Sequence, residues 1–222
     1  MAASTDKKKA DIKIVIVGDA CVGKTSFIRR YMDGTFTENP GQTVGACFFL
    51  KQWGKYNIAL WDTAGEERFS GLSSFYCRDA SAAIIAYDIT TRNSFELLQE
   101  RYIPLLEAAK EDCLLCMTGM KKDLLSERSR EVTQEEAKEF AFRLNASRFQ
   151  AIKRRDPQKK IKEPFFETSS KSGENVDKVF QYIFTSLLPS DGTLEAKRPD
   201  TLQLDRDKQP SIETTKSRGC CN

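Results

Sequence analysis

The residues that most constrain this chain are GDACVGKT at positions 18–25, which lie between an apolar β-branched run and a helical stretch. Gly18 and Gly23 allow the backbone to curl so that successive N–H groups point inward, and a helix start adds partial positive charge. Lys24 is placed to contact the β- and γ-phosphates of a nucleotide, and the Thr25 hydroxyl to ligate the Mg²⁺ between them. The pattern therefore predicts a phosphate-binding loop for a nucleoside triphosphate.

Short apolar runs alternate with amphipathic helical stretches through the first 188 residues. The expected elements are Ile12–Val17, Lys24–Met32, Ala46–Trp53, Tyr56–Trp61, Ala82–Asp88, Ser94–Ala109, Cys113–Thr118, Thr133–Asn145, Pro164–Thr168 and Val176–Leu188. This order predicts an α/β domain with a mostly parallel sheet. Trp53 and Tyr56 flank Gly54-Lys55, which predicts a tight hairpin and makes one pair of strands antiparallel.

The composition divides the chain into three parts. Residues 11–188 are expected to form one folded domain, residues 1–10 a flexible N-terminus, and residues 189–222, rich in Pro, Ser, Thr, Asp and Lys, a disordered tail. Within the domain, the basic run KRRDPQKKIK at 153–162 is interpreted as a solvated surface loop. Contact of this run with acidic lipid headgroups or an acidic partner is the alternative.

Several classes of function are excluded by composition. The net charge of +3 is spread along the chain, so nucleic-acid binding is not expected, and the absence of histidine excludes an imidazole base. Seven cysteines without a framework spacing indicate a reducing compartment, and no apolar run is long enough to cross a bilayer. Cys113 and Cys116 form a C-x-x-C, but without a second pair we expect them in a buried strand.

Later segments resemble a known family. They are WDTAG at 61–65, Lys121 with Asp123, and TSSK at 168–171, which in this order are similar to the motifs of Ras-like small GTPases. WDTAGEERF at 61–69, Tyr76, Tyr87-Asp88 and a terminal double cysteine are typical of the Rab branch. The short hairpin in 50–65, the enlarged loop near residue 155 and the ending GCCN resemble one particular member. The resemblance implies a small GTPase fold, a mixed six-stranded sheet with one antiparallel pair and about five helices.

The resemblance also implies a set of site residues. Those expected to bind GTP or GDP are Gly18, Ala20, Cys21, Val22, Gly23, Lys24, Thr25, Ser26, Phe36, Thr43, Gly65, Lys121, Asp123, Ser169, Ser170 and Lys171; Thr25, Thr43 and Asp62 would hold Mg²⁺; and Lys24, Gly65 and Glu66 are the catalytic candidates. Asp123 would select guanine by accepting from its N1–H and 2-amino groups. The Gly65 N–H would contact the γ-phosphate, so that segments 36–48 and 64–78 become ordered only with triphosphate bound.

Three positions depart from the family pattern. Glu66 stands where a glutamine usually orients the attacking water, and an ionised carboxylate only accepts hydrogen bonds. Ala20 adds a methyl group to the phosphate loop, and Met120 replaces an asparagine amide. We expect slow intrinsic hydrolysis and weaker nucleotide retention, with tolerated variation in a working switch as the alternative interpretation of all three positions. Two hypotheses for function follow, a regulated switch or a GTP-loaded scaffold with negligible turnover. A nucleotide kinase would need an arginine-rich lid, which the sequence lacks.

The C-terminal residues indicate how the protein reaches membranes. Cys220 and Cys221 resemble the double geranylgeranyl site of Rabs, and two lipid chains give stable anchoring. The resemblance implies an exchange factor, a GTPase-activating protein, Rab escort protein, GDI and switch-reading effectors as partners of a monomeric domain. It also implies the cytoplasmic face of endosomes, phagosomes or Golgi, with a cytosolic pool. Phe48, Trp61 and Tyr76 match the aromatic set that effectors contact, with packing as the alternative role.

Overall fold

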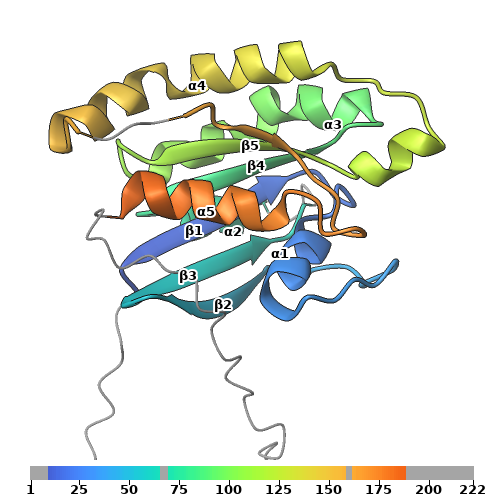
Figure 1. Cartoon of the computed structure of the whole chain (residues 1–222), viewed down its shortest axis with the longest axis horizontal. Coiled ribbons are helices and arrows are strands. Elements are labelled where there is room, and N and C mark those ends of the chain that lie inside the picture. The colour runs from blue at the N-terminus through green and yellow to red at the C-terminus, as the bar shows by residue number, and fades with distance from the viewer. Residues whose placement is uncertain (1–9, 66–69, 159–161, 189–222) are drawn as a thin grey trace, which may run out of the picture.

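The computed structural model describes residues 10–65, 70–158 and 162–188, and these form a six-stranded sheet flanked by helices (Figure 1). The strands are β1 (Ile12–Gly18), β2 (Ala46–Trp53), β3 (Tyr56–Thr63), β4 (Ala82–Asp88), β5 (Leu114–Met120) and β6 (Phe165–Glu167), in the order β2-β3-β1-β4-β5-β6. β2 and β3 are antiparallel, with Trp53 opposite Tyr56, and the other pairs are parallel. The predicted mixed sheet and its hairpin at Gly54-Lys55 are confirmed.

In the described part of the chain, five α-helices cover the sheet. They are α1 (Lys24–Asp33), α2 (Ser70–Cys77), α3 (Arg92–Leu97), α4 (Gln134–Arg155) and α5 (Val176–Leu187). Side chains of α1 and α5 pack on one face of the sheet, beside Ile14 and Ile16, whereas those of α3 and most of α4 pack on the other, beside Val15 and Val17. The alternation of β1 side chains between two apolar layers explains why that strand is apolar from Ile14 to Val17.

The prediction of one helix over Ser94–Ala109 was wrong. After α3 the chain forms a π-helical turn, Leu98–Tyr102, and then a 3-10 turn, Pro104–Ala108. Pro104 has no N–H to continue the α-helical pattern. The N–H of Ile103 donates to the carbonyl of Leu98, five residues back, at 2.9 Å. Tyr102 is the last residue of this wider turn.

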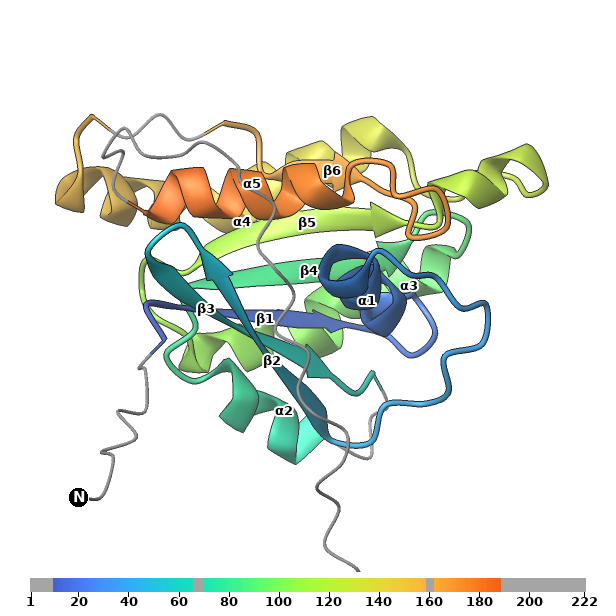
Figure 2. The same cartoon turned by 60° about the horizontal axis from the view of Figure 1, so that its bottom comes forward.

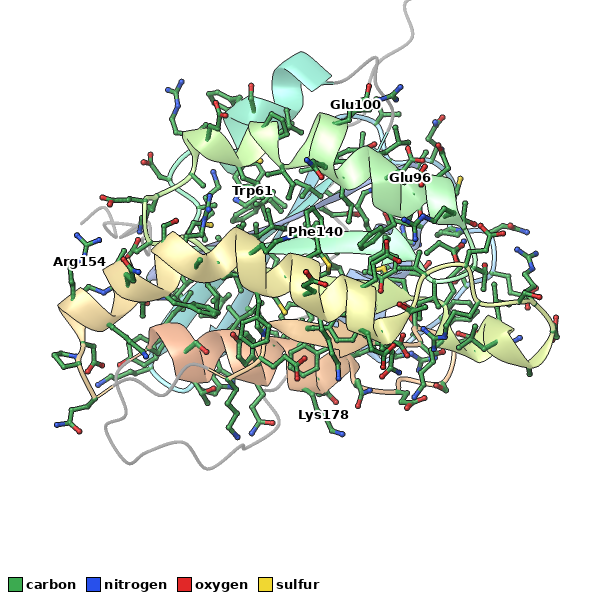
Figure 3. The ribbon with its side chains drawn as sticks, turned by 90° about the horizontal axis from the view of Figure 1, so that it is seen from above. Trp61, Glu96, Glu100, Phe140, Arg154 and Lys178 are labelled. Carbon is green, nitrogen blue, oxygen red and sulfur yellow. The ribbon has the colours of Figure 1, made fainter. Side chains whose placement is uncertain are left out.

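The predicted loop at 153–162 was also partly wrong, because α4 continues to Arg155. Lys153, Arg154 and Arg155 form the last turn of that helix, where positive charge is favoured by the helix dipole. All three side chains are exposed, and Arg155 pairs with Asp112; Figure 3 shows Arg154 at the end of α4. Helix α2 was not predicted as an element. The predicted tail, 189–222, and residues 1–9 of the predicted N-terminus lie outside the described residues.

The two cysteines of the C-x-x-C are core residues, as predicted. Cys116 lies within β5 and Cys113 directly precedes that strand. Both are fully buried, and burial raises the pKa of each thiol to about 12. Such thiols are poor nucleophiles and poor metal ligands. Among the residues that the structure describes, no three His, Cys, Asp or Glu side chains form a group suited to a metal. None of the helices described here is long and apolar enough to cross a membrane.

The parallel strands set the place of the site. The carboxyl ends of β1, β3, β4 and β5 lie at the same end of the sheet, and the loops that follow them meet there, beside the start of α1 (Figure 2). Open α/β sheets bind ligands at this end. The phosphate loop, the segment after β3 and the base-recognition segments predicted from the sequence are therefore neighbours in the fold.

Candidate nucleotide-binding site

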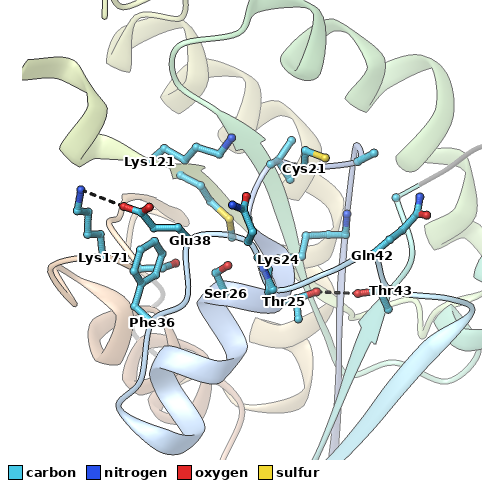
Figure 4. A pocket seen from close by; sticks show the side chains of 18 of the residues that line it. Cys21, Lys24, Thr25, Ser26, Phe36, Glu38, Gln42, Thr43, Lys121 and Lys171 are labelled. Atoms are coloured by element: carbon cyan, nitrogen blue, oxygen red, sulfur yellow. Dashed lines mark hydrogen bonds and ion pairs between the residues drawn. The ribbon is translucent and has the colours of Figure 1, made fainter. Parts of the chain in front are cut away.

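A cavity of about 680 Å³ opens at the carboxyl end of the sheet (Figure 4). The predicted residues that line it are Ala20, Cys21, Val22, Gly23, Lys24, Thr25, Ser26, Phe36, Thr43, Gly65, Lys121, Asp123, Ser170 and Lys171. Gly18, Asp62 and Ser169 are adjacent to this lining but not part of it, and Glu66 lies outside the described residues. Segments separated by more than a hundred residues thus form one pocket.

The phosphate loop has the curled backbone that its glycines predict. Gly23 has a φ of 108° and Cys21 a φ of 60°, both in the left-handed region. Gly18 has a φ of 147°, and a Cβ there would lie 2.1 Å from the carbonyl oxygen of Ala86 on β4. The requirement for glycine at position 18 therefore comes from the close approach of two strands as well as from the loop itself.

Lys24 lies folded over the inside of the loop. Its Nζ donates to the carbonyl oxygens of Gly18 at 2.8 Å and Asp19 at 2.7 Å, and the residue is only 6% exposed. Burial lowers the pKa of the ammonium to about 8, although the nearby Asp62 and Asp19 carboxylates oppose that shift. A buried cation whose partners are mainly carbonyl oxygens is suited to receive an anionic phosphate.

The three predicted Mg²⁺ ligands provide hard oxygen atoms in one place. The Thr25 and Thr43 hydroxyl oxygens are 2.8 Å apart, although they come from α1 and from the loop before β2. Asp62 is fully buried, and in the described part of the chain neither carboxylate oxygen has a hydrogen bond of good geometry. Burial is the main cause that raises the pKa of Asp62, although the nearby Thr25 hydroxyl and Lys24 ammonium act to lower it. A buried carboxylate that lacks a well-formed hydrogen bond and lies beside two hydroxyls fits a Mg²⁺ ion.

The other end of the pocket is built to hold Asp123. The Ser169 hydroxyl donates to an Asp123 carboxylate oxygen at 2.5 Å, so Ser169 orients Asp123 and does not line the cavity. Lys121 has a left-handed φ of 63°, and its Nζ pairs with the Asp88 carboxylate at 2.7 Å. Two acceptor oxygens on an oriented carboxylate match the N1–H and 2-amino donors of guanine.

Met120, which replaces the expected asparagine, packs beneath the phosphate loop. The residue is 1% exposed, and its sulfur lies 3.6 Å from where a Cβ on Gly23 would be. The contact between β5 and the phosphate loop at this point is therefore a dispersion contact and not a hydrogen bond.

Two residues that hold the site in place through backbone carbonyl groups were not predicted from the sequence. Arg30 on α1 donates to the carbonyl oxygens of Ser170 and Lys171, each at 2.6 Å, and so holds the loop at the base end of the pocket. Tyr102 contacts the segment after β3. Both act on backbone carbonyl groups, which every sequence carries, so no motif marks them. Glu38, which pairs with Lys171 at 3.9 Å, was also not predicted.

The predicted aromatic set forms a surface patch on β2, β3 and α2. Phe48 is 53% exposed, and its ring centroid lies 5.1 Å from that of Trp61, which lies 5.5 Å from that of Tyr76. The predicted packing role is therefore confirmed, whereas contact with effectors stays a prediction. The rings pack on one another, and Phe48 remains available for contact.

Comparison with known proteins agrees with this geometry. The Ras family matches residues 13–188. Ras-related protein Rab-20 of Homo sapiens is 38% identical over 240 residues, which cover 96% of this chain and 99% of that protein. Rab-20 of Mus musculus is 38% identical over 235 residues with the same coverage, and Ras-related protein Rab-31 of Homo sapiens is 33% identical over 207 residues, which cover 88% and 96%. Rab-20 is the member that the hairpin, the loop and the ending GCCN resemble.

Proposed function

This chain belongs to the Ras family of small GTPases, in its Rab branch, and on that premise we propose that it is a trafficking switch which hydrolyses Mg-GTP slowly without assistance. The observation that carries the proposal is the single pocket that unites the phosphate loop, the Thr25 and Thr43 hydroxyls and the oriented Asp123 carboxylate. Lys24 would hold the phosphates, and the ion on Thr25, Thr43 and Asp62 would supply charge neutralisation when bound.

Guanine selection is tested by changing the oriented carboxylate. In Asp123→Asn, an amide N–H replaces one acceptor, so guanine loses a partner and xanthine, whose 2-position carries a carbonyl group, gains one. In a competition assay, unlabelled GDP and XDP each displace a fluorescently labelled nucleotide. We expect GDP to be the better competitor for the wild type and XDP the better competitor for Asp123→Asn. An unchanged preference for GDP would show that Asp123 does not contact the base.

Slow hydrolysis rests on Glu66 and Ala20. An ionised carboxylate only accepts hydrogen bonds, so Glu66 would not donate to the transferring phosphoryl group, and Ala20 lines the pocket, where its methyl group would obstruct water. Single-turnover hydrolysis by purified protein should be faster in Glu66→Gln than in the wild type, with Ala20→Gly as a second, independent variant. An equal rate in wild type and Glu66→Gln would refute a retarding role for Glu66.

The second candidate is a membrane-anchored scaffold that stays GTP-bound with negligible hydrolysis. The apolar contact of Met120 with the phosphate loop contributes to this alternative, because a dispersion contact tethers that loop less firmly than an asparagine hydrogen bond would, although the Arg30 bonds to the base-recognition loop do not depend on it. The nucleotide content of protein isolated from cells distinguishes the two. A scaffold would carry mainly GTP, and adding a GTPase-activating protein would not release phosphate.

Membrane attachment and partners follow from the same premise. We propose geranylgeranyl groups on Cys220 and Cys221, delivery by Rab escort protein, extraction by GDI, and cycling by an exchange factor and a GTPase-activating protein. The proposed place is the cytoplasmic face of endosomes, phagosomes or Golgi, with a cytosolic pool. Replacing both cysteines with serine should leave the protein in the soluble fraction of cells, and continued membrane association of that variant would count against lipid anchoring.

A further inference from the structure

The hydroxyl of Tyr102 lies where three distant segments meet. It is 2.8 Å from the carbonyl oxygen of Gly65 and 3.2 Å from Oδ1 of Asp19 in the phosphate loop. Since a hydroxyl has one proton, it donates to the nearer Gly65 carbonyl, while the Asp19 oxygen already accepts from the Ala20 N–H at 2.8 Å. Tyr102 is 7% exposed, so these contacts are shielded from water.

Tyr102 is presented by an irregular helix turn. It is the last residue of the π-helical turn Leu98–Tyr102, and such turns displace the residues after them relative to a regular helix. The turn lies against β1 and β4, and its Tyr102 hydroxyl reaches Asp19 of the phosphate loop. The backbone feature that the sequence did not predict is therefore the one that brings the phenol to the site.

Gly65 also lies very close to the phosphate loop. A Cβ at this position would lie 2.5 Å from the Ala20 N atom and 2.5 Å from the Lys24 Nζ, so only glycine fits between the phosphate loop and its neighbours. The hydroxyls of Thr25 and Thr43 are also within hydrogen-bond distance, at 2.8 Å. Thr43 of the segment 36–48 and Gly65 of the segment 64–78, both expected to respond to the γ-phosphate, thus lie against the phosphate loop together.

We propose that Tyr102 is a positioning residue that holds Gly65 against the phosphate loop and thereby favours triphosphate over diphosphate. This rests on the proposed function of the pocket as a GTP and GDP site. With its carbonyl fixed by the phenol, Gly65 has less freedom to move away from the place where its N–H would reach a γ-phosphate. A diphosphate has no γ-phosphate for Gly65 to contact and gains nothing from that placement. The hydrogen bond from Tyr102 to Gly65 therefore raises the affinity for triphosphate relative to the affinity for diphosphate.

The test removes only the hydroxyl group of Tyr102. In full-length Tyr102→Phe, the dissociation constants for GDP and for the non-hydrolysable analogue GppNHp are measured with Mg²⁺. We expect the preference for GppNHp over GDP to fall about fivefold relative to wild type, equivalent to about 1 kcal/mol for one hydrogen bond. The matched control is Tyr182→Phe, because the Tyr182 hydroxyl donates to the Lys162 carbonyl at 3.1 Å and is equally buried, at 7%, on the opposite face of the sheet.

The outcomes separate this proposal from the one on which it rests. A Tyr102→Phe ratio within twofold of wild type, or an equal change in Tyr182→Phe, would overturn the role of Tyr102. Failure of the wild type to bind either nucleotide would instead overturn the proposed function. If Tyr102→Phe is too unstable for binding measurements, the difference between the Tm shifts produced by GppNHp and GDP gives the same comparison.

Discussion

Arg30 connects the two ends of the nucleotide pocket, and its replacement gives the sharpest prediction for nucleotide retention. The residue lies on α1, the helix that begins at the phosphate loop. Its guanidinium donates to the carbonyl oxygens of Ser170, Lys171 and Gly34, each at 2.6 Å. Two of these bonds reach Ser170 and Lys171, which are among the residues expected to bind the nucleotide. Without the two hydrogen bonds from Arg30, the loop that contains Ser170 and Lys171 is held less firmly at the base end of the pocket.

The size of the effect follows from the hydrogen bonds. A bond from a charged donor contributes about 1.5–3 kcal/mol, but Arg30 is partly exposed and solvent weakens each one. We therefore assign about 1.5 kcal/mol to the two bonds together, which corresponds to roughly tenfold faster release of GDP from Arg30→Gln. Arg30→Lys should release GDP nearly as fast, because an ammonium cannot reproduce the planar fork.

The assay is displacement of a fluorescent GDP analogue by excess GDP, followed in time. Arg143→Gln on α4 is the matched control, since that arginine makes only an exposed pair with Glu139 at 3.7 Å and packs over the Phe140 ring. Thermal unfolding of each variant with nucleotide excludes a general loss of structure. Release from Arg30→Gln within twofold of wild type would refute the reasoning, and full retention by Arg30→Lys would show that charge alone is enough.

Three further predictions concern pH, stability and Mg²⁺. The pKa of Lys24 is lowered to about 8 in the free protein, and phosphates would raise it, so GDP affinity should fall by up to about tenfold per pH unit above pH 8. A pH-independent affinity between pH 8 and 9.5 would contradict this. Asn145 is fully buried and bonds both the N–H and the carbonyl of Leu115, at 3.0 and 2.8 Å. Asn145→Ala should lower the free energy of unfolding in urea by about 2–4 kcal/mol, because two β5 groups lose their partners. Asp62→Asn should weaken the dependence of GDP release on Mg²⁺, so that EDTA accelerates release much less than in wild type; equal acceleration would exclude Asp62 from metal binding.

The parts of the structure that were predictable from sequence are those specified by neighbouring residues. The order strand, GDACVGKT and helix predicts the phosphate loop because each residue acts on its own backbone. The hairpin at Gly54-Lys55 is predictable for the same reason, and Gly54 has the positive φ, 58°, that such a turn requires.

The parts that could not be predicted depend on contacts between distant residues. Arg30 and Ser170 are 140 positions apart, and Tyr102 reaches Gly65 only because a π-helical turn carries it there. The end of α4 at Arg155 was missed because a basic run is equally compatible with a loop and with a helix C-terminus. Ser169 was predicted to bind the nucleotide, and the hydrogen bond of its hydroxyl to Asp123 was not foreseen. A motif identifies such a residue but not the partner of its side chain.

These contacts bear on what the departure at Met120 does. Met120 contributes dispersion to the phosphate loop, whereas Arg30, on the helix that extends from that loop, makes charge-assisted hydrogen bonds to the base-recognition loop. The connection between the phosphate end and the base end therefore does not depend on residue 120 alone. Weak nucleotide retention consequently does not follow from Met120 by itself, whereas slow hydrolysis, if Glu66 causes it, is independent of Arg30. A GTP-loaded scaffold requires only slow hydrolysis, whereas a regulated switch is compatible with both slow hydrolysis and weak nucleotide retention. The hydrolysis rate, more than the exchange rate, therefore distinguishes the two hypotheses.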